Sequence, residues 1–68
     1  MRTTNWDAIF NNVGIDDVEM FANGQTSARH FEGLNSEARW LVRNYGAAKA
    51  RQLAQRALNR KLNGCYAS

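Results

Sequence analysis

The sequence predicts an all-α fold, and three observations lead to this prediction. The 68 residues include no proline, and stretches of helix-forming residues separate the five glycines. In these stretches apolar residues recur three and four positions apart, as on the buried face of a helix. Each glycine falls where such a pattern ends. We therefore expect a small compact bundle of four to five helices, with short N-terminal helices and a longer C-terminal αα-hairpin turning at Gly46.

The length of the chain is that of one small domain. We expect residues 1–63 to form a single helical domain and residues 64–68 to form a flexible C-terminal tail. So short a chain has one modest core, which must offset the conformational entropy lost on folding.

Two short helices are predicted before Gly24. The first has Thr4 as its N-cap, ends at Gly14 and carries an apolar face with the spacing i, i+3, i+4 and i+7. That face consists of Trp6, Ile9, Phe10 and Val13. The second helix begins with Asp16 as its N-cap, and Glu19 follows at the spacing of a capping box. Its inward residues are Val18, Phe21 and Ala22.

A third short helix, capped by Thr26 or Ser27, is predicted to end at Gly33. Its inward residues are Ala28 and Phe31. The fourth helix opens within residues 34–36, and its apolar stripe is Ala38, Leu41, Val42 and Tyr45. We expect it to end at Gly46, because the apolar arc of the next segment is rotated by roughly 150°. A straight helix would direct its two apolar arcs to nearly opposite sides.

The segment Ala47–Asn63 is predicted to form the longest helix, and it contains no acidic residue. Its apolar arc consists of Ala50, Leu53, Ala54, Ala57, Leu58 and Leu62. A strip of basic and amide residues follows another side, namely Lys49, Gln52, Arg56, Arg60 and Asn63. The alanines allow another backbone to approach closely. That backbone belongs either to one of the chain's own helices, which we favour slightly, or to a second copy in a homodimer through the alanine face of residues 47–62.

Charge is distributed unevenly along the chain. Residues 1–37 hold all six acidic residues and two basic ones, a net charge of −4. Residues 38–68 hold seven basic residues and no acidic one, a net charge of +7. Two interpretations stay open: the halves attract each other within the fold, or the basic half meets an external polyanion such as nucleic acid.

The candidate binding residues lie on the last two predicted helices. They are Arg39, Trp40, Arg43, Lys49, Gln52, Arg56 and Arg60. Arginine and amide side chains suit phosphates and base edges. The alternative for the basic strip is a solvated helix face, or one paired with the acidic half. Trp40 lies about 160° from the centre of its helix's apolar stripe. It either stacks on a base or anchors a protein partner, or it packs under the N-terminal helix.

The stretch from Leu41 to Lys49 is loosely similar to the Tyr-Gly turn of GntR-type helix-turn-helix regulators. The resemblance covers about a third of the chain. It departs from the pattern at Gln52, where the second helix should present a β-branched core residue, because Leu53 comes one position late. No wing hairpin follows. The chain is therefore not assigned to this family.

The residues favour no enzyme, cofactor, metal site or small-molecule substrate. His30 is the only histidine and Cys65 the only cysteine, whereas a catalytic triad or a His/Cys metal site needs further partners. The acidic cluster of Asp16, Asp17 and Glu19 falls in the first turn of a predicted helix, where acids complement the helix dipole.

A cytoplasmic location is expected. No apolar run approaches the roughly 18 residues that a membrane span needs. Arg2 is followed by polar residues rather than by the apolar run of a signal peptide. A single cysteine cannot form an internal disulfide, which favours a reducing compartment.

Together these features favour a small non-enzymatic regulatory module. It would bind a nucleic acid, or a nucleic-acid-bound complex, through its basic C-terminal helix. The alternative is a protein-binding inhibitor or adaptor of the phage accessory, anti-host-defence type that docks on a host protein complex. A third option is a structural subunit whose basic face packs against its own acidic half.

Overall fold

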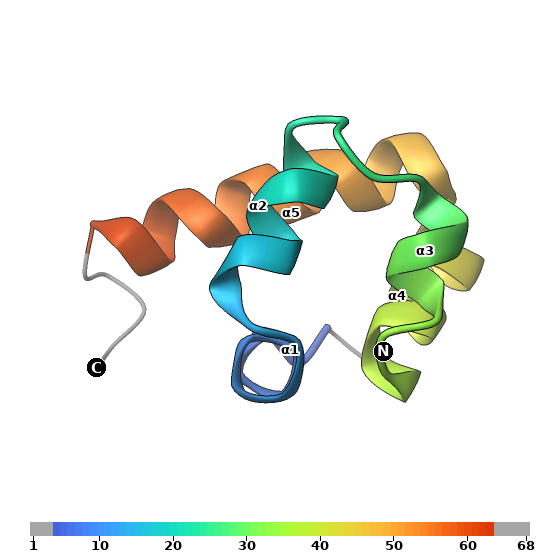
Figure 1. Ribbon diagram of the computed structural model, residues 1–68, viewed down its shortest axis with the longest axis horizontal. Coiled ribbons are helices and arrows are strands. Elements are labelled where there is room, and N and C mark those ends of the chain that lie inside the picture. Colours follow the sequence, from blue (N-terminus) through green and yellow to red (C-terminus); the bar gives the residue numbers. More distant parts are fainter. Residues whose placement is uncertain (1–3, 64–68) are drawn as a thin grey trace.

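The computed structural model describes residues 4–63, which fold into five α-helices joined by short turns (Figure 1). The helices are α1 (Trp6–Val13), α2 (Ile15–Ala22), α3 (Ala28–Glu32), α4 (Ser36–Tyr45) and α5 (Ala47–Leu62). The predicted all-α class is confirmed, with three short helices first and the longest helix last. The tail predicted for residues 64–68, with Cys65, lies outside the described residues, as does Arg2.

The N-caps of the first two helices differ from the prediction. Asn5, not Thr4, caps α1, and its side-chain Oδ1 accepts a hydrogen bond from the Ala8 N–H at 3.1 Å. α2 follows Gly14 directly and has no side-chain cap. Asp16 therefore lies in the first turn of α2 and not at its N-cap, because the single residue Gly14 makes the corner between the two helices.

The next two N-caps fall within the predicted residues. The Ser27 Oγ accepts a hydrogen bond from the His30 N–H at 3.1 Å and caps α3. Asn35 caps α4, and its Oδ1 accepts from the Ala38 N–H at 2.8 Å. These bonds satisfy backbone donors that have no partner inside the first turn of a helix.

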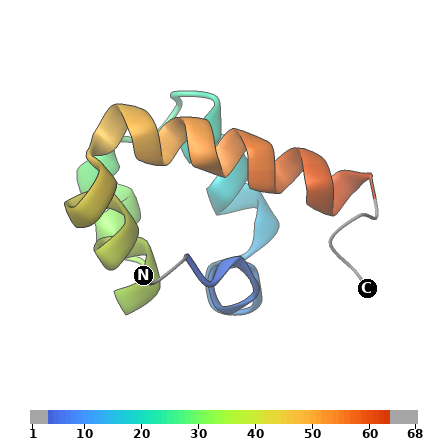
Figure 2. The ribbon, with the colours of Figure 1, turned by 180° about the vertical axis from the view of Figure 1, so that it is seen from behind.

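α4 and α5 meet at Gly46, as predicted. There φ is +85° and ψ is 161°, a backbone conformation that essentially only glycine adopts. In both ribbon views the axis of α4 points in a clearly different direction from the axis of α5 (Figures 1 and 2). The two helices therefore form a corner at Gly46: the predicted turn is present, but the helices do not lie side by side as in the predicted αα-hairpin.

The core is shared by all five helices. α2 crosses α5, α3 packs against α4, and α1 contacts both α2 and α4 (Figures 1 and 2). The rings of Phe21 and Phe31 stack with their centroids 4.1 Å apart and join α2 to α3. Both of these residues, and Ile9 and Leu41 with them, are completely buried.

The alanine face of α5 packs inside the chain. Ala50 and Ala54 are completely buried and Ala57 is 2% exposed, and α2 is the main partner of α5. The small side chains let the two helices approach closely. The contact is therefore intramolecular, and a second copy could reach these three alanines only if the fold opened.

Two residues assigned to apolar stripes lie in solvent. Leu62 is 64% exposed, because it is the last residue of α5 and extends beyond the helices that cover the preceding turns. Tyr45, the last residue of α4, is 38% exposed. The apolar period thus predicts the middle of each helix better than its ends.

The C-terminal end of α2 reverses at Gly24, where φ is +79°. The Gln25 N–H donates to the Met20 carbonyl at 2.8 Å, and the Gly24 N–H donates to the Phe21 carbonyl at 3.1 Å. These two bonds form a Schellman motif. The prediction that the helix stops at Asn23-Gly24 is confirmed.

Arg51 and Gln55, one turn apart on α5, hold this end of α2, and we call the pair the α2 clamp. The Arg51 Nε donates to the Phe21 carbonyl at 2.9 Å, and its Nη2 donates to the Thr26 carbonyl at 3.2 Å. The Gln55 Nε2 donates to the Ala22 carbonyl at 2.8 Å. Carbonyls at a helix C-terminus lack partners within the helix and carry its negative dipole charge, so a guanidinium suits them.

Removing the guanidinium of the clamp should destabilise the fold. We expect Arg51→Met to lower the free energy of unfolding by about 1–3 kcal/mol, because it removes two charge-assisted hydrogen bonds while keeping an apolar stem. The matched control is Arg56→Met, at an exposed position of the same helix, which should change stability by less than about 0.5 kcal/mol. Urea denaturation followed by circular dichroism measures both. Equal effects of the two substitutions would contradict this role of Arg51.

A methyl group at the α4–α5 corner should also be costly. Gly46→Ala is expected to destabilise the protein by about 1–3 kcal/mol, because alanine does not readily adopt the backbone angles of this position. Gly33→Ala is the control, since Gly33 has a φ of −78° and its added Cβ would meet backbone oxygens at ordinary contact distances. Thermal melts compare the two variants. A Tm for Gly46→Ala at or above that of Gly33→Ala would show that the corner is not strained for other residues.

Candidate functional site

The predicted basic strip contains the cations Lys49, Arg56 and Arg60 and the amide Gln52 on α5, and Asn63 follows as the C-cap of the helix. All five residues are exposed. At 1.5 Å per residue the three cations span about 16 Å along the helix. Within residues 4–63, none of the three makes an ion pair with a carboxylate. The strip is therefore a row of solvated positive charge on one side of a helix whose other side is buried.

The acidic half of the chain does not cover this strip. The Glu37 Oε2 accepts a hydrogen bond from the Asn5 backbone N–H at 3.0 Å. The Glu32 Oε1 lies 3.3 Å from the Arg43 Nε. Asp7 and Asp16 are exposed in the first turns of α1 and α2. These four carboxylates thus lie at helix ends or at the contact between α3 and α4, and no carboxylate within residues 4–63 forms an ion pair with the strip.

The predicted patch on α4 is only partly open. Arg39 and Arg43 are exposed, and the side chain of Arg43 retains 72% of its accessible surface. Trp40 is half-buried and meets the ring of Tyr45 edge-on, at a centroid distance of 5.9 Å and an interplanar angle of 80°. Trp40 is therefore neither a core residue nor fully exposed.

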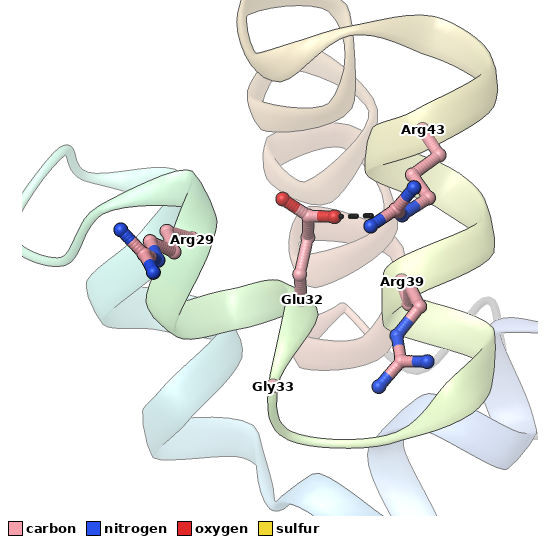
Figure 3. Close-up of a pocket in the computed structure, with 5 residues that line it drawn as sticks. All are labelled: Arg29, Glu32, Gly33, Arg39 and Arg43. Atoms are coloured by element: carbon pink, nitrogen blue, oxygen red, sulfur yellow. Dashed lines mark ion pairs between the residues drawn. The ribbon is translucent and has the colours of Figure 1, made fainter.

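A hollow between α3 and α4 brings together three arginines from two helices (Figure 3). It is open to solvent, has a volume of about 530 Å³ and is lined by Arg29, Glu32, Gly33, Arg39 and Arg43. We call it the arginine hollow. Nothing in the sequence singles out Arg29 as a binding residue. Arg29 and Glu32 have the i, i+3 spacing of one helix face, but nothing in the pattern places that face opposite α4.

The position that departs from the helix-turn-helix pattern lies in solvent. Gln52 is exposed, whereas Leu53 is half-buried against the core. Gln52 is thus free to join the basic strip, where its amide can both donate and accept hydrogen bonds. The side of α5 that packs on the protein is defined by its alanines.

The described residues offer few groups for chemistry. Within residues 4–63, no three histidine, cysteine or acidic residues gather in a way that could hold a metal ion. His30 is exposed on α3, outside the residues that line the arginine hollow. Helices long and apolar enough to cross a membrane are likewise absent from this part of the chain.

Comparison with known proteins gives no relative from which a role could be transferred. No model of a protein family matches the chain, and neither a curated protein nor a solved structure shows significant similarity to it.

Proposed function

We propose that this chain is a small, non-enzymatic regulatory module that binds nucleic acid through the basic strip of α5. The observation that carries the proposal is the solvent exposure of Lys49, Arg56 and Arg60 without carboxylate partners among the described residues. Clustered cations that no internal anion neutralises are the electrostatic footprint of proteins that bind polyanions.

The dimensions of the strip suit a phosphate backbone. Its span of about 16 Å corresponds to roughly five base-pair steps of duplex DNA, at about 3.4 Å of helix axis per phosphate of one strand. Each lysine or arginine that meets a phosphate releases condensed counterions, which is the main source of sequence-independent affinity. Gln52 lies beside the cations and can bond to phosphates, sugars or base edges.

The core supports this use of α5. The alanine face is fixed against α2, and the α2 clamp prevents the helix from rotating about its axis. The cations therefore project from a rigid element whose orientation is set before binding. A preorganised surface loses less conformational entropy on association.

Neutralising the strip should reduce both affinity and salt dependence. We expect the triple variant Lys49→Gln, Arg56→Gln, Arg60→Gln to reduce the slope of log K against log salt by roughly 2–3 units on duplex DNA. Fluorescence anisotropy with duplex and single-stranded DNA and with RNA, across a salt series, measures the slope. The charge-conserving variant Lys49→Arg, Arg56→Lys, Arg60→Lys is the control and should keep most of it. A wild-type protein with no salt-dependent affinity for any of these probes would refute the proposal.

A second function is favoured by the aromatic pair on α4. Tyr45 is 38% exposed beside the half-buried Trp40, and the exposed Arg39 and Arg43 flank the tryptophan in sequence. Aromatic residues and arginine dominate the energetics of protein interfaces. This surface would suit a protein-binding inhibitor or adaptor, of the kind that phages direct against host defences, docking on a host protein complex.

Tyr45→Ala separates this second function from the first. The residue is exposed at the end of α4, so its truncation should leave the fold intact. If the chain is an inhibitor or adaptor, a defined protein should co-purify with it after nuclease treatment and be lost on this substitution. The neutralised strip variant is the control. A partner that nuclease removes, and that Tyr45→Ala retains, would instead favour nucleic-acid binding.

A further inference from the structure

The arginine hollow presents guanidinium groups from two helices. Arg29 and Glu32 come from α3, and Arg39 and Arg43 come from α4, with Gly33 at the end of α3 between them (Figure 3). The helix backbones are held by the core, because Phe31 and Leu41 are completely buried. The mouth of the hollow is therefore framed by fixed elements, while its long side chains extend into water.

The charges in the hollow do not balance. Three arginines face one carboxylate, that of Glu32, and only Arg43 is paired with it, at 3.3 Å from Nε to Oε1. Within residues 4–63, Arg29 and Arg39 have no carboxylate partner. Figure 3 shows the Glu32 carboxylate between the Arg29 and Arg43 side chains. The hollow thus carries a net charge of about +2, and its single internal anion occupies part of the space in which an external anion would sit.

The pair between Glu32 and Arg43 is easily exchanged. The Arg43 side chain is 72% exposed, and an ion pair at such a position contributes little to stability. A phosphate offers more acceptor oxygens than a carboxylate, and arginine can bind it through two parallel hydrogen bonds. An incoming phosphate can therefore replace Glu32 at Arg43 and gain Arg29 and Arg39 as further donors.

We propose that the arginine hollow is a second phosphate site for the bound nucleic acid, and that Glu32 is a built-in competitor that the phosphate displaces from Arg43. This inference rests on the proposed function. A nucleic acid fits better than a single acidic side chain, because Arg39 and Arg43 lie on α4, and α5 with the basic strip follows α4 directly after the corner at Gly46. A partner with repeating charge offers phosphates to both surfaces.

Removing the competitor should strengthen binding. We expect Glu32→Gln to raise the affinity for a short oligonucleotide roughly two- to fivefold more than Glu19→Gln does. Glu19→Gln is the matched control, because it removes the same charge from an exposed position on α2 outside the hollow. Fluorescence anisotropy at constant salt measures both variants, and circular dichroism verifies that each remains folded.

Removing the unpaired arginines should act in the opposite direction. Arg29→Gln with Arg39→Gln should lower the affinity several-fold and reduce the salt slope by roughly 1–2 units. Arg29→Lys with Arg39→Lys should recover the slope but only part of the affinity, because lysine lacks the planar fork. A polyglutamate peptide of similar length serves as a second probe and should bind more weakly than the oligonucleotide.

The outcomes separate the two proposals. The proposed function stands if the wild type binds the oligonucleotide and the strip variant loses affinity. The hollow is nevertheless not a phosphate site if Glu32→Gln has the same affinity as Glu19→Gln, and if the double variant of Arg29 and Arg39 has the same affinity as the wild type. If no oligonucleotide binds the wild type, both fail. Preference for polyglutamate, lost on the double arginine substitution, would make the hollow a docking site for an acidic protein and overturn the inference.

Discussion

The orientation of α5 depends on the hydrogen bonds that Arg51 and Gln55 donate to the carbonyls at the end of α2. They fix which side of α5 faces the core, since a rotation of the helix would break all of them together. The buried alanines allow the close approach that these short bonds need. Because Arg51 also lies 4.7 Å above the ring of Phe21, the clamp links the polar end of α2 to the aromatic stack of the core.

The exposure of the basic strip follows from this constraint. Lys49, Arg56 and Arg60 lie on a side of α5 away from the alanines, so fixing one side leaves the other in water. A further contact of α5 lies in its last turn, where the Lys61 ammonium is 5.4 Å from the centroid of the Phe10 ring. Of the cations on α5, Arg51 and Lys61 thus belong to the fold, and the remaining three are available for a partner.

The sequence predicts the helices well because glycine and the apolar period act locally. Gly46 ends a helix through its own backbone angles, and no distant residue is needed to see this. The sequence places the N-cap of α1 one residue early, because neighbouring polar residues such as Thr4 and Asn5 can both cap a helix. It misplaces the N-cap of α2 because the corner at Gly14 leaves no room for a side-chain cap. In the sequence Arg51 is only one of the seven basic residues of the second half, because its carbonyl partners are 25 and 30 residues away. The arginine hollow cannot be predicted from the sequence for the same reason, since it exists only once α3 lies against α4.

The most direct test of the account compares the arginine side-chain Nε–Hε groups of α5 by NMR, with and without an oligonucleotide. The Hε of Arg51 should exchange slowly with water and keep its chemical shift on titration, because it is bonded to the Phe21 carbonyl inside the fold. The Hε groups of Arg56 and Arg60 should exchange fast in the free protein and shift on titration, because they lie in solvent on the strip. Equal exchange at all three arginines, or a shift of Arg51 in place of the other two, would contradict the division of α5 into a structural side and a binding side.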